Sequence, residues 1–174
     1  MKAICEANIS TSLGKFAVRC SERGIREISF GAGRNAPKSR NGASTEKGVA
    51  VADDTQRTKA AEWARRAAKE LEEYAGGQRR KFTVPLDLEG TSFQKKVWGA
   101  LRTIPYGETR SYGEIARQVG NPRAARAVGM ANHENPVAIV VPCHRVIAGD
   151  GSLGGYAGGL KRKSRILGLE KSQA

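Results

Sequence analysis

The chain has 174 residues, which is enough to bury a hydrophobic core in one large domain or two small ones. Lys and Arg number 30 against 17 Asp and Glu, which gives a formal net charge of +13 at pH 7. This charge argues against basic partners and favours a polyanion, with nucleic acid ahead of an anionic membrane surface. A basic protein without a polyanionic partner is the alternative.

The first 14 residues lack the continuous apolar segment of a signal peptide, and no apolar run approaches the roughly 18 residues of a membrane-spanning helix. The sequence therefore predicts a cytoplasmic protein with no membrane partner. Its three cysteines, Cys5, Cys20 and Cys143, form no dense framework, so we expect reduced thiols.

The N-terminal part of the chain predicts three strands of an antiparallel meander, at residues 3–10, 14–20 and 25–30. Residues 31–54 follow and are rich in Gly, Ser, Ala and charged residues without periodicity. This composition predicts a mobile loop that takes no part in the chemistry.

Residues 55–77 predict a helix, because Ala, Glu, Lys and Arg dominate the segment and two glycines end it. Apolar side chains recur every three or four residues, at Trp63, Ala67, Leu71 and Tyr74. We expect both aromatic rings of this set in the core. Residues 81–90 then predict a short strand and a connecting segment.

The composition changes near Gly90, where we place the boundary between an N-terminal domain, residues 1–90, and a C-terminal domain, residues 91–174. The C-terminal domain holds 13 Lys and Arg against five Asp and Glu, so most of the net positive charge lies there. Its first helix is predicted at residues 93–104. Thr91 and Gln94 have the spacing of a capping box at the start of that helix.

Two shorter helices are predicted at residues 111–120 and 121–135. Ser111 and Glu114 repeat the capping-box spacing, and Asn121 is expected to be the N-cap of the second helix, with a proline after it. Two short helices with a tight connection form a helix-turn-helix pattern, although many such pairs never touch DNA.

The second of these helices strengthens the DNA-binding interpretation. Its Arg123 and Arg126 are separated by two small alanines, so a narrow basic face can enter a groove without steric obstruction. Tyr112, at the start of the first helix, is placed to contact a base or a phosphate. The alternative is that Tyr112 packs in the core and the arginines form a solvated face.

The stretch VVPCHRVI places Cys143 and His144 side by side. It can hold a catalytic thiol with its base, a set of metal ligands, or a buried cysteine beside a surface histidine. Pro142 ends an apolar run at residues 137–141 that we interpret as a strand, which predicts an exposed turn for Cys143. His144 and Arg145 then favour the thiolate, and His144 reaches the thiol if the backbone turns or a water bridges the two.

The metal interpretation is the weakest of the three. His133 and His144 are the only histidines, and the sequence contains no CxxC or HxxxH spacing. We therefore predict no metal and no cofactor.

Three segments carry a resemblance to a known family: SYGEIARQVGNPRAARAVGMA, NPVAIVVPCHRVI and GYAGGLKRKSRILGLE. Over residues 91–170 they resemble the O6-alkylguanine-DNA alkyltransferases in order and spacing. Residues 1–90 fit the smaller, more variable domain of that family in layout only. The resemblance implies an α/β N-terminal domain with a small antiparallel sheet and a mainly α-helical C-terminal domain containing a helix-turn-helix.

The resemblance also implies roles for single residues in the reaction. Cys143 matches the alkyl-accepting nucleophile, and His144 matches the base that acts on it through a water. Glu170 matches the carboxylate that orients this histidine, and Asn135 matches the asparagine that supports the active-site turns. The pocket for the alkylated base is expected at Tyr156, Val146 and Ala157.

On the DNA side, Arg126 matches an arginine that fills the gap left by a rotated-out nucleotide. Tyr112 matches a tyrosine that presses on the phosphate 3' to that nucleotide. Further DNA contacts are expected at Asn121, Arg123 and Ala125. The implied partner is double-stranded DNA containing alkylated guanine, bound by a monomer.

The implied activity is DNA repair by stoichiometric transfer of the alkyl group from O6-alkylguanine to Cys143; the sequence does not decide whether O4-alkylthymine is also a substrate. The thioether product has no carbonyl for water to attack, so we expect one turnover per molecule. Some relatives hold zinc through two cysteines and two histidines, but residues 1–90 contain no histidine, so we expect no zinc.

Two alternatives of other classes are kept. A lesion-binding protein of the same fold performs no chemistry, and such relatives replace the cysteine that stands here as Cys143. An unrelated Cys-His hydrolase needs an oxyanion hole and leaves the basic helix-turn-helix without a purpose.

Overall fold

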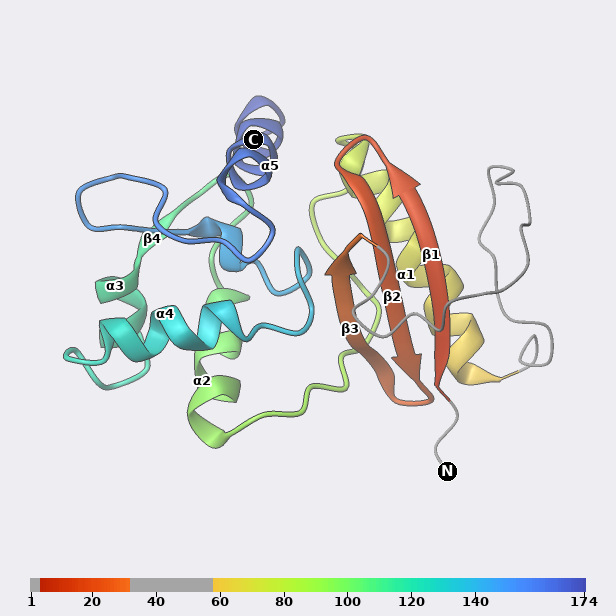
Figure 1. Ribbon diagram of the computed structural model, residues 1–174, viewed down its shortest axis with the longest axis horizontal. Helices are drawn as coiled ribbons and strands as arrows, with labels where there is room; N and C mark the ends of the chain where they lie inside the picture. Colours follow the sequence, from red (N-terminus) through yellow and green to blue (C-terminus); the bar gives the residue numbers. More distant parts are fainter. Residues whose placement is uncertain (1–3, 32–57) are drawn as a thin grey trace. The chain divides into compact units, whose positions relative to one another are not determined.

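The computed structural model describes residues 4–31 and 58–174. The chain divides into two compact units, Met1–Asp87 and Leu88–Ala174 (Figure 1). The first unit is a sheet covered by a helix and the second is mainly helical, which confirms the predicted fold class. Beyond Gly31, the loop predicted at residues 31–54 lies outside the described residues.

The sheet of the first unit is the predicted antiparallel meander, with strands β1 (Cys5–Thr11), β2 (Gly14–Ser21) and β3 (Gly24–Phe30). Buried side chains alternate with more exposed ones along β1, as a half-buried strand requires. The cross-strand pairs Ile9–Phe16 and Val18–Ile28 are buried in the core.

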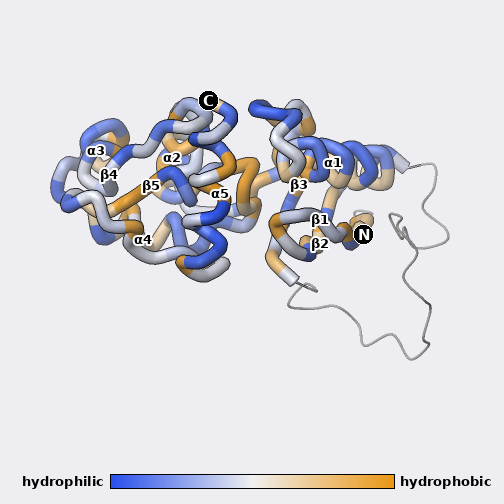
Figure 2. The backbone as a smooth tube through the Cα atoms, turned by 90° about the horizontal axis from the view of Figure 1, so that it is seen from above, coloured by the Kyte–Doolittle hydropathy of each residue, from blue (hydrophilic) through white to orange (hydrophobic). Residues whose placement is uncertain are grey.

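Helix α1 (Lys59–Ala75) covers one face of this sheet (Figure 1). Hydropathy alternates along the helix (Figure 2), and its buried side consists largely of alanines, which allow a close approach to the strands. Tyr74 lies in the core as predicted. The prediction of a core position for Trp63 is wrong, since this residue is only partly buried and its indole N–H donates to the Glu22 carbonyl near the surface, at 3.1 Å.

The strand predicted within residues 81–90 is reduced to a single bridge between Leu86 and Ile25. The Ile25 N–H donates to the Pro85 carbonyl, and the Asp87 N–H donates to the Ile25 carbonyl, both at 2.8 Å. Pro85 has no N–H to donate, so the ladder does not extend along this segment.

The second unit contains, in chain order, α2 (Ser92–Leu101), β4 (Arg110–Ser111), α3 (Tyr112–Gln118), α4 (Ala125–His133), the 3-10 helix η1 (Cys143–Arg145), β5 (Val146–Ile147) and α5 (Leu160–Ser172). Strands β4 and β5 pair in parallel, which joins the segment after η1 to the start of α3. Within residues 4–31 and 58–174, no helix is long and apolar enough to cross a membrane.

The two predicted capping boxes of this unit are formed. The Thr91 hydroxyl accepts from the Gln94 N–H at 3.2 Å, and the Gln94 side chain accepts from the Thr91 N–H at 2.7 Å. Ser111 and Glu114 repeat the arrangement with the same two distances. Helices α2 and α3 therefore begin where local sequence predicts.

Helix α4 begins later than predicted, and Asn121 does not cap it. The Asn121 carbonyl instead accepts from the Ala124 N–H at 3.0 Å and closes a turn that has Pro122 in its second position. The fixed φ of proline suits that position, so the turn displaces the first helical residues. Helix α4 starts at Ala125 without a side-chain cap.

Candidate active site and DNA-binding surface

The apolar run before Cys143 is a buried turn and not the predicted strand. The Val141 N–H donates to the Val137 carbonyl at 3.0 Å, and Ala138 forms an isolated bridge with Val141. Ile139 has a φ of 72°, in the left-handed region that costs a β-branched residue roughly 1–3 kcal/mol. Hydrophobic periodicity did not reveal this turn, because every residue of the run is apolar.

Asn135 ties this turn to the thiol. Its Oδ1 accepts from the Val137 N–H at 3.0 Å. Its Nδ2 donates to the Val141 carbonyl at 2.8 Å and to the Cys143 sulfur at 3.1 Å. A single side chain thus fixes both ends of the strained turn and the position of the sulfur.

Cys143 is 7% exposed, so the exposed turn predicted for it is wrong. The turn is buried because α2 and α5 both pack against η1. Burial raises the pKa of the Cys143 thiol, and the hydrogen bond from Asn135 and the charge of Lys163 offset this only in part. We infer a protonated thiol at neutral pH, which must lose its proton when it attacks.

His144 and Glu170 form a fully buried pair, with His144 Nε2 at 2.9 Å from Glu170 Oε1. Arg145 binds the same carboxylate twice, from Nε to Oε2 at 2.9 Å and from Nη2 to Oε1 at 2.8 Å. Its Nη1 donates to the Ile104 carbonyl at 2.8 Å. The Gly107 N–H adds a further bond to Glu170 at 3.3 Å. The carboxylate is therefore surrounded by donors.

These bonds fix the charges of the pair. Burial alone would raise the pKa of Glu170, but the hydrogen bonds from His144 and Arg145 hold that pKa well below its usual range. Burial lowers the pKa of His144, and the bond to Glu170 opposes the shift without reversing it. We infer an ionised carboxylate and a neutral imidazole with its proton on Nε2, so that Nδ1 is the basic nitrogen.

Lys163 is a buried cation that sequence reasoning missed. Its Nζ donates to the backbone carbonyls of Val146, Leu153 and Gly155. Burial lowers the pKa of Lys163 to about 8, and Cys143 opposes this shift. Lys163 in turn lowers the pKa of Cys143, whereas the charge of Arg145 is paired with Glu170. Lys163, and not Arg145, is therefore the cation that favours the thiolate.

Tyr112 links the helix pair to the loop that precedes α5. A Cβ placed on Gly154 of that loop would come within 3.1 Å of the tyrosine ring, and one on Gly129 of α4 would come within 3.9 Å. Burial raises the pKa of Tyr112, nearby Cys143 raises it further, and a hydrogen bond from the Gly155 backbone opposes both. Tyr112 is thus close to the thiol and to α4 at once.

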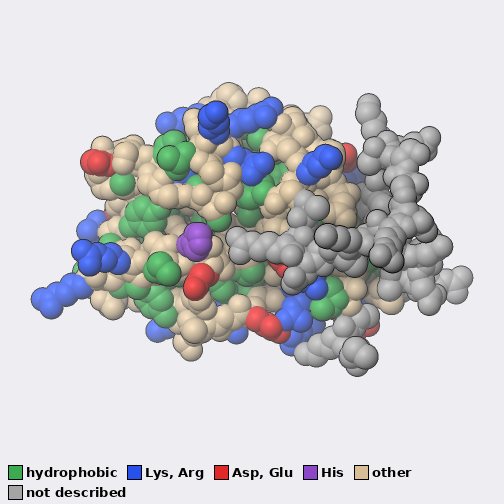
Figure 3. Space-filling model, in the orientation of Figure 1, with side chains coloured by type: hydrophobic (Ala, Val, Ile, Leu, Met, Phe, Trp, Pro, Cys, Tyr) green, Lys and Arg blue, Asp and Glu red, His purple; other side chains and the backbone are tan. Residues whose placement is uncertain are grey.

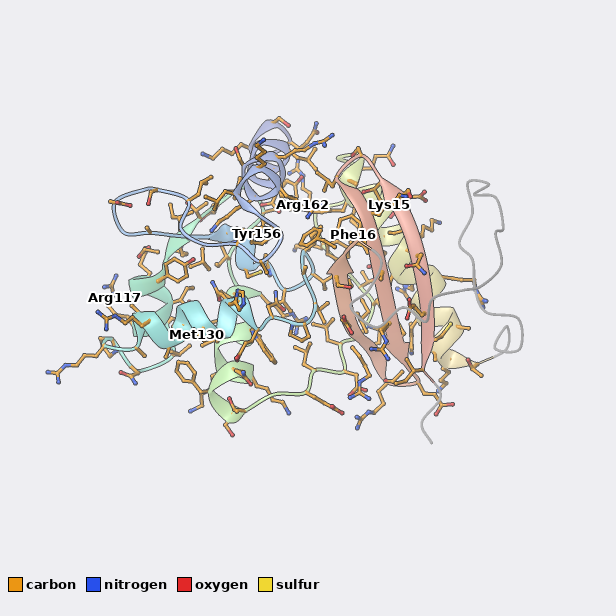
Figure 4. All side chains as sticks on the ribbon, in the orientation of Figure 1. Lys15, Phe16, Arg117, Met130, Tyr156 and Arg162 are labelled. Atoms are coloured by element: carbon orange, nitrogen blue, oxygen red, sulfur yellow. The ribbon has the colours of Figure 1, made fainter. Side chains whose placement is uncertain are left out.

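Tyr156 lies on the loop that leads into α5 (Figure 4). Burial raises the pKa of its phenol well above the usual value, and Cys143 adds to the shift, so the phenol keeps its proton. The other two residues predicted for the base pocket differ in exposure. Val146 is fully buried in β5, and Ala157 is exposed.

The residues predicted to contact DNA gather at the α3–α4 turn and the start of α4. Asn121 and Arg123 are exposed in the turn, Arg126 is exposed on α4, and Ala125 is partly buried. Figure 3 shows Lys and Arg side chains over this end of the second unit, with few acidic side chains among them. Exposed arginines fit both DNA contact and the solvated face of the alternative, and Tyr112 is only partly buried.

Family comparisons cover almost the whole chain. Residues 92–172 match the family model described as "6-O-methylguanine DNA methyltransferase, DNA binding domain". Residues 4–88 match the one described as "6-O-methylguanine DNA methyltransferase, ribonuclease-like domain". A methylated-DNA–protein-cysteine methyltransferase of Methanosarcina barkeri is 43% identical over 164 residues, which is 94% of this chain and 95% of the relative. The chain belongs to this family.

Other members of the methyltransferase family are similar in sequence and structure. A relative from Mycobacterium tuberculosis is 62% identical over 108 residues, a stretch that spans 62% of this chain and 66% of the relative. The crystal structure of the M. tuberculosis O6-methylguanine methyltransferase has a TM-score of 0.77 at 42% identity and covers 99% of this chain and 95% of that one. The structure of M. tuberculosis OGT in complex with DNA has a TM-score of 0.75 at 42% identity, covering 96% and 92%.

A sequence signal for Lys163 does exist. The buried residues of α5 recur every three or four positions, at Lys163, Ile166, Leu167 and Glu170. Two ionisable residues therefore share the apolar side of the last helix, and buried charges of this kind are paired or functional. The ion pair between Arg145 and Glu170 has no such signal in the sequence, because the two residues are far apart along the chain.

Proposed function

We propose that this protein repairs DNA by moving the alkyl group of O6-alkylguanine in duplex DNA onto Cys143, once per molecule. We further propose that it acts as a monomer in the cytoplasm. The observation that supports this most is the arrangement of Cys143 and His144. Asn135 donates a hydrogen bond to the Cys143 sulfur, and Glu170 binds Nε2 of the neutral imidazole of His144. A nucleophile with an adjacent oriented base is what alkyl transfer requires.

Binding to DNA would begin with the basic face at the start of α4. The O6 substituent lies inside the base stack, so the nucleotide must leave the duplex at a cost of a few kcal/mol. Arg126, exposed on α4, is suited to fill the vacated space and so lower that cost. Tyr112, whose ring lies near Gly129 of α4 and Gly154 of the loop before α5, is suited to hold the phosphate next to the extruded nucleotide.

The transfer step joins the Cys143 sulfur to the alkyl carbon. The thiol proton passes through a water to His144, the S–C bond forms as the C–O6 bond breaks, and the electron pair of the broken bond goes to guanine. The Tyr156 hydroxyl donates a hydrogen bond to the leaving base. The base takes up a proton from solvent, and His144 releases to solvent the proton that it took from the thiol. The products are a thioether on Cys143 and an unmodified guanine.

The buried charges favour this step in the direction of transfer. A neutral His144 can accept the proton on Nδ1, and the ionised Glu170 stabilises the imidazolium that results. Lys163 stabilises the thiolate as it forms. Burial of these groups away from bulk solvent strengthens each of these interactions.

Two other functions have less support. A lesion-binding protein of the same fold needs no nucleophile, yet here Cys143 is held by a hydrogen bond and lies beside an oriented base. A Cys-His hydrolase would leave the basic surface around Arg126 unused. A hydrolase would also turn over repeatedly, whereas the thioether of the proposed reaction has no carbonyl for water to attack and so accounts for one turnover per molecule.

Mass spectrometry of the intact protein tests the proposed function. After mixing with a duplex containing O6-methylguanine, the mass should rise by about 14 Da, the difference between a thiol hydrogen and a methyl group. The unmodified duplex is the control and should leave the mass unchanged. Binding of the modified duplex without any mass increase would favour the lesion-binding alternative.

A further inference from the structure

Helix α4 carries an exposed apolar side chain that the proposed function leaves unused. Met130, labelled on α4 in Figure 4, has a side chain that is 60% exposed. Helix residues three and four apart share a face, so Met130 stands with Arg126 and His133, both also exposed. Val128 and Ala131 are buried on the opposite face. Met130 is thus central to the surface that α4 presents to solvent.

This surface borders the candidate active site. Gly129, the neighbour of Met130, lies against the Tyr112 ring, and the same ring contacts Gly154 of the loop before α5. Tyr112 is close enough to Cys143 for the two groups to influence each other electrostatically. A DNA duplex that places a nucleotide beside Cys143 therefore passes close to Met130.

The residues around Met130 indicate what it contacts. Arg126 precedes it by one turn and His133 follows it by three residues, and residues 121–133 contain no Asp or Glu. A DNA duplex has anionic phosphates on its outside and exposes apolar base surfaces where a base step is opened. An apolar side chain within a basic face is complementary to both features. Methionine is flexible enough to fill such an irregular space, and apolar side chains act as wedges between base steps in other DNA-bending proteins.

We propose that Met130 is a second DNA-contact residue on α4 and acts beside Arg126. Its side chain packs against the bases and sugars uncovered when the target nucleotide leaves the stack, so that the arginine and the methionine together keep the gap open. This inference rests on the proposed function. It assigns Met130 to the extrusion of the nucleotide and leaves the chemistry at Cys143 unchanged.

Single-turnover transfer rates of three variants test the proposal. With duplex O6-methylguanine, Met130→Ala and Met130→Gln should each be about tenfold slower than the wild type, because the apolar contact is lost. Met130→Leu, which keeps the apolar volume, should stay within about twofold. All three should match the wild type with free O6-benzylguanine, which has no stack to leave. The deficit of Met130→Ala should shrink when the modified guanine faces a mismatched base, since unstacking is then easier.

The outcomes separate this inference from the proposed function. If the wild type transfers from both substrates but Met130→Ala matches it on the duplex, Met130 is not a DNA contact and the proposed function stands. If Met130→Ala slows transfer from the duplex and from the free base equally, Met130 supports the pocket or the fold, and the inference is again overturned. If the wild type transfers from neither substrate, the proposed function itself fails. Because Met130 is exposed, we expect all three variants to fold.

Discussion

At Cys143, burial and hydrogen bonding act in opposite directions on the thiol. Burial raises its pKa, while Asn135 and Lys163 pull that pKa down without restoring it. A protonated thiol is stable against chance alkylation and oxidation, because the thiolate is the reactive form. The sulfur therefore becomes nucleophilic when His144 takes its proton.

Replacement of Cys143 tests its assignment as the acceptor. Cys143→Ala should abolish methyl transfer but leave affinity for duplex DNA within about twofold, since the basic surface supplies the affinity. Cys20→Ala is the matched control and should keep full transfer, because burial raises the pKa of Cys20 to about 12 and makes it a poor nucleophile. Transfer that persists in Cys143→Ala, measured by mass, would assign the acceptor to another residue.

Replacement of Lys163 tests its link to the thiol. Lys163→Met leaves the carbonyls of Val146, Leu153 and Gly155 without this donor. Only the Val146 contact is fully buried, and an unsatisfied buried carbonyl costs about 1–3 kcal/mol, so we expect a lower melting temperature. It should also raise the pKa of Cys143 further, seen as a shift of the ultraviolet thiolate absorbance to higher pH. Lys163→Arg, which keeps the charge, should restore part of the thiolate effect. A purely structural lysine would lower the melting temperature and leave the thiolate titration unchanged.

At the level of secondary structure, the starts of α3 and α4 are both fixed by hydrogen bonds, and exposed arginines lie next to the start of α4. The capping box of Ser111 and Glu114 fixes the start of α3, and the closed turn at Asn121 and Pro122 fixes the start of α4. Arg126 then lies in the first turn of α4, one helical turn from Met130. Side chains on such rigid elements can enter a base stack without first ordering a loop.

Arg126→Ala distinguishes an arginine that fills the stack from one that binds a phosphate. Transfer from duplex O6-methylguanine should slow roughly 10- to 100-fold, because extrusion costs a few kcal/mol that Arg126 offsets. Transfer from free O6-benzylguanine should be nearly unchanged. Arg117→Ala removes the same charge from α3 and should lower affinity without changing the rate at saturation. Equal slowing of both substrates by Arg126→Ala would show that this residue shapes the pocket.

Local sequence predicted those elements whose signals are local. The capping boxes, the meander and the Pro-Cys-His-Arg core could be read directly, because each depends on residues a few positions apart. The predicted start of α4 was wrong because Pro122 suits a turn as well as a first helical position. The turn at Ile139 and the burial of Cys143 arise from packing by α2 and α5, which no short stretch of sequence records.

At the scale of the whole molecule, stability should depend on the charge state of the buried pair. The pKa of Glu170 is lowered in the folded protein, so its contribution is present above the ordinary value of 4.5 and lost as the pH falls. The pKa of His144 is also lowered, so below its ordinary value of 6.5 the unfolded chain binds more protons and stability again falls. Both groups destabilise the fold in the same direction, toward acid.

Urea unfolding from about pH 8 to about pH 4 measures this dependence. The free energy of unfolding should decrease as the pH falls below about 6.5, with a steeper decrease near the ordinary pKa of glutamate. Glu170→Gln should lose part of the steeper decrease, and the rest should remain because the pKa values of Glu70 and Asp87 are also lowered in the folded protein. A free energy of unfolding that increases from neutral pH toward acid would contradict the neutral His144 and the ionised Glu170.

In the proposed reaction, one alkyl group moves to one sulfur and stays there. The most direct measurement treats the protein with an excess of O6-methylguanine duplex, follows the mass to completion and maps the modified peptide. Uptake should stop at about one methyl group per molecule, and this group should lie on Cys143, within the peptide between Arg126 and Arg145. Continued demethylation of DNA beyond one equivalent, or a methyl group on Cys5 or Cys20, would contradict it.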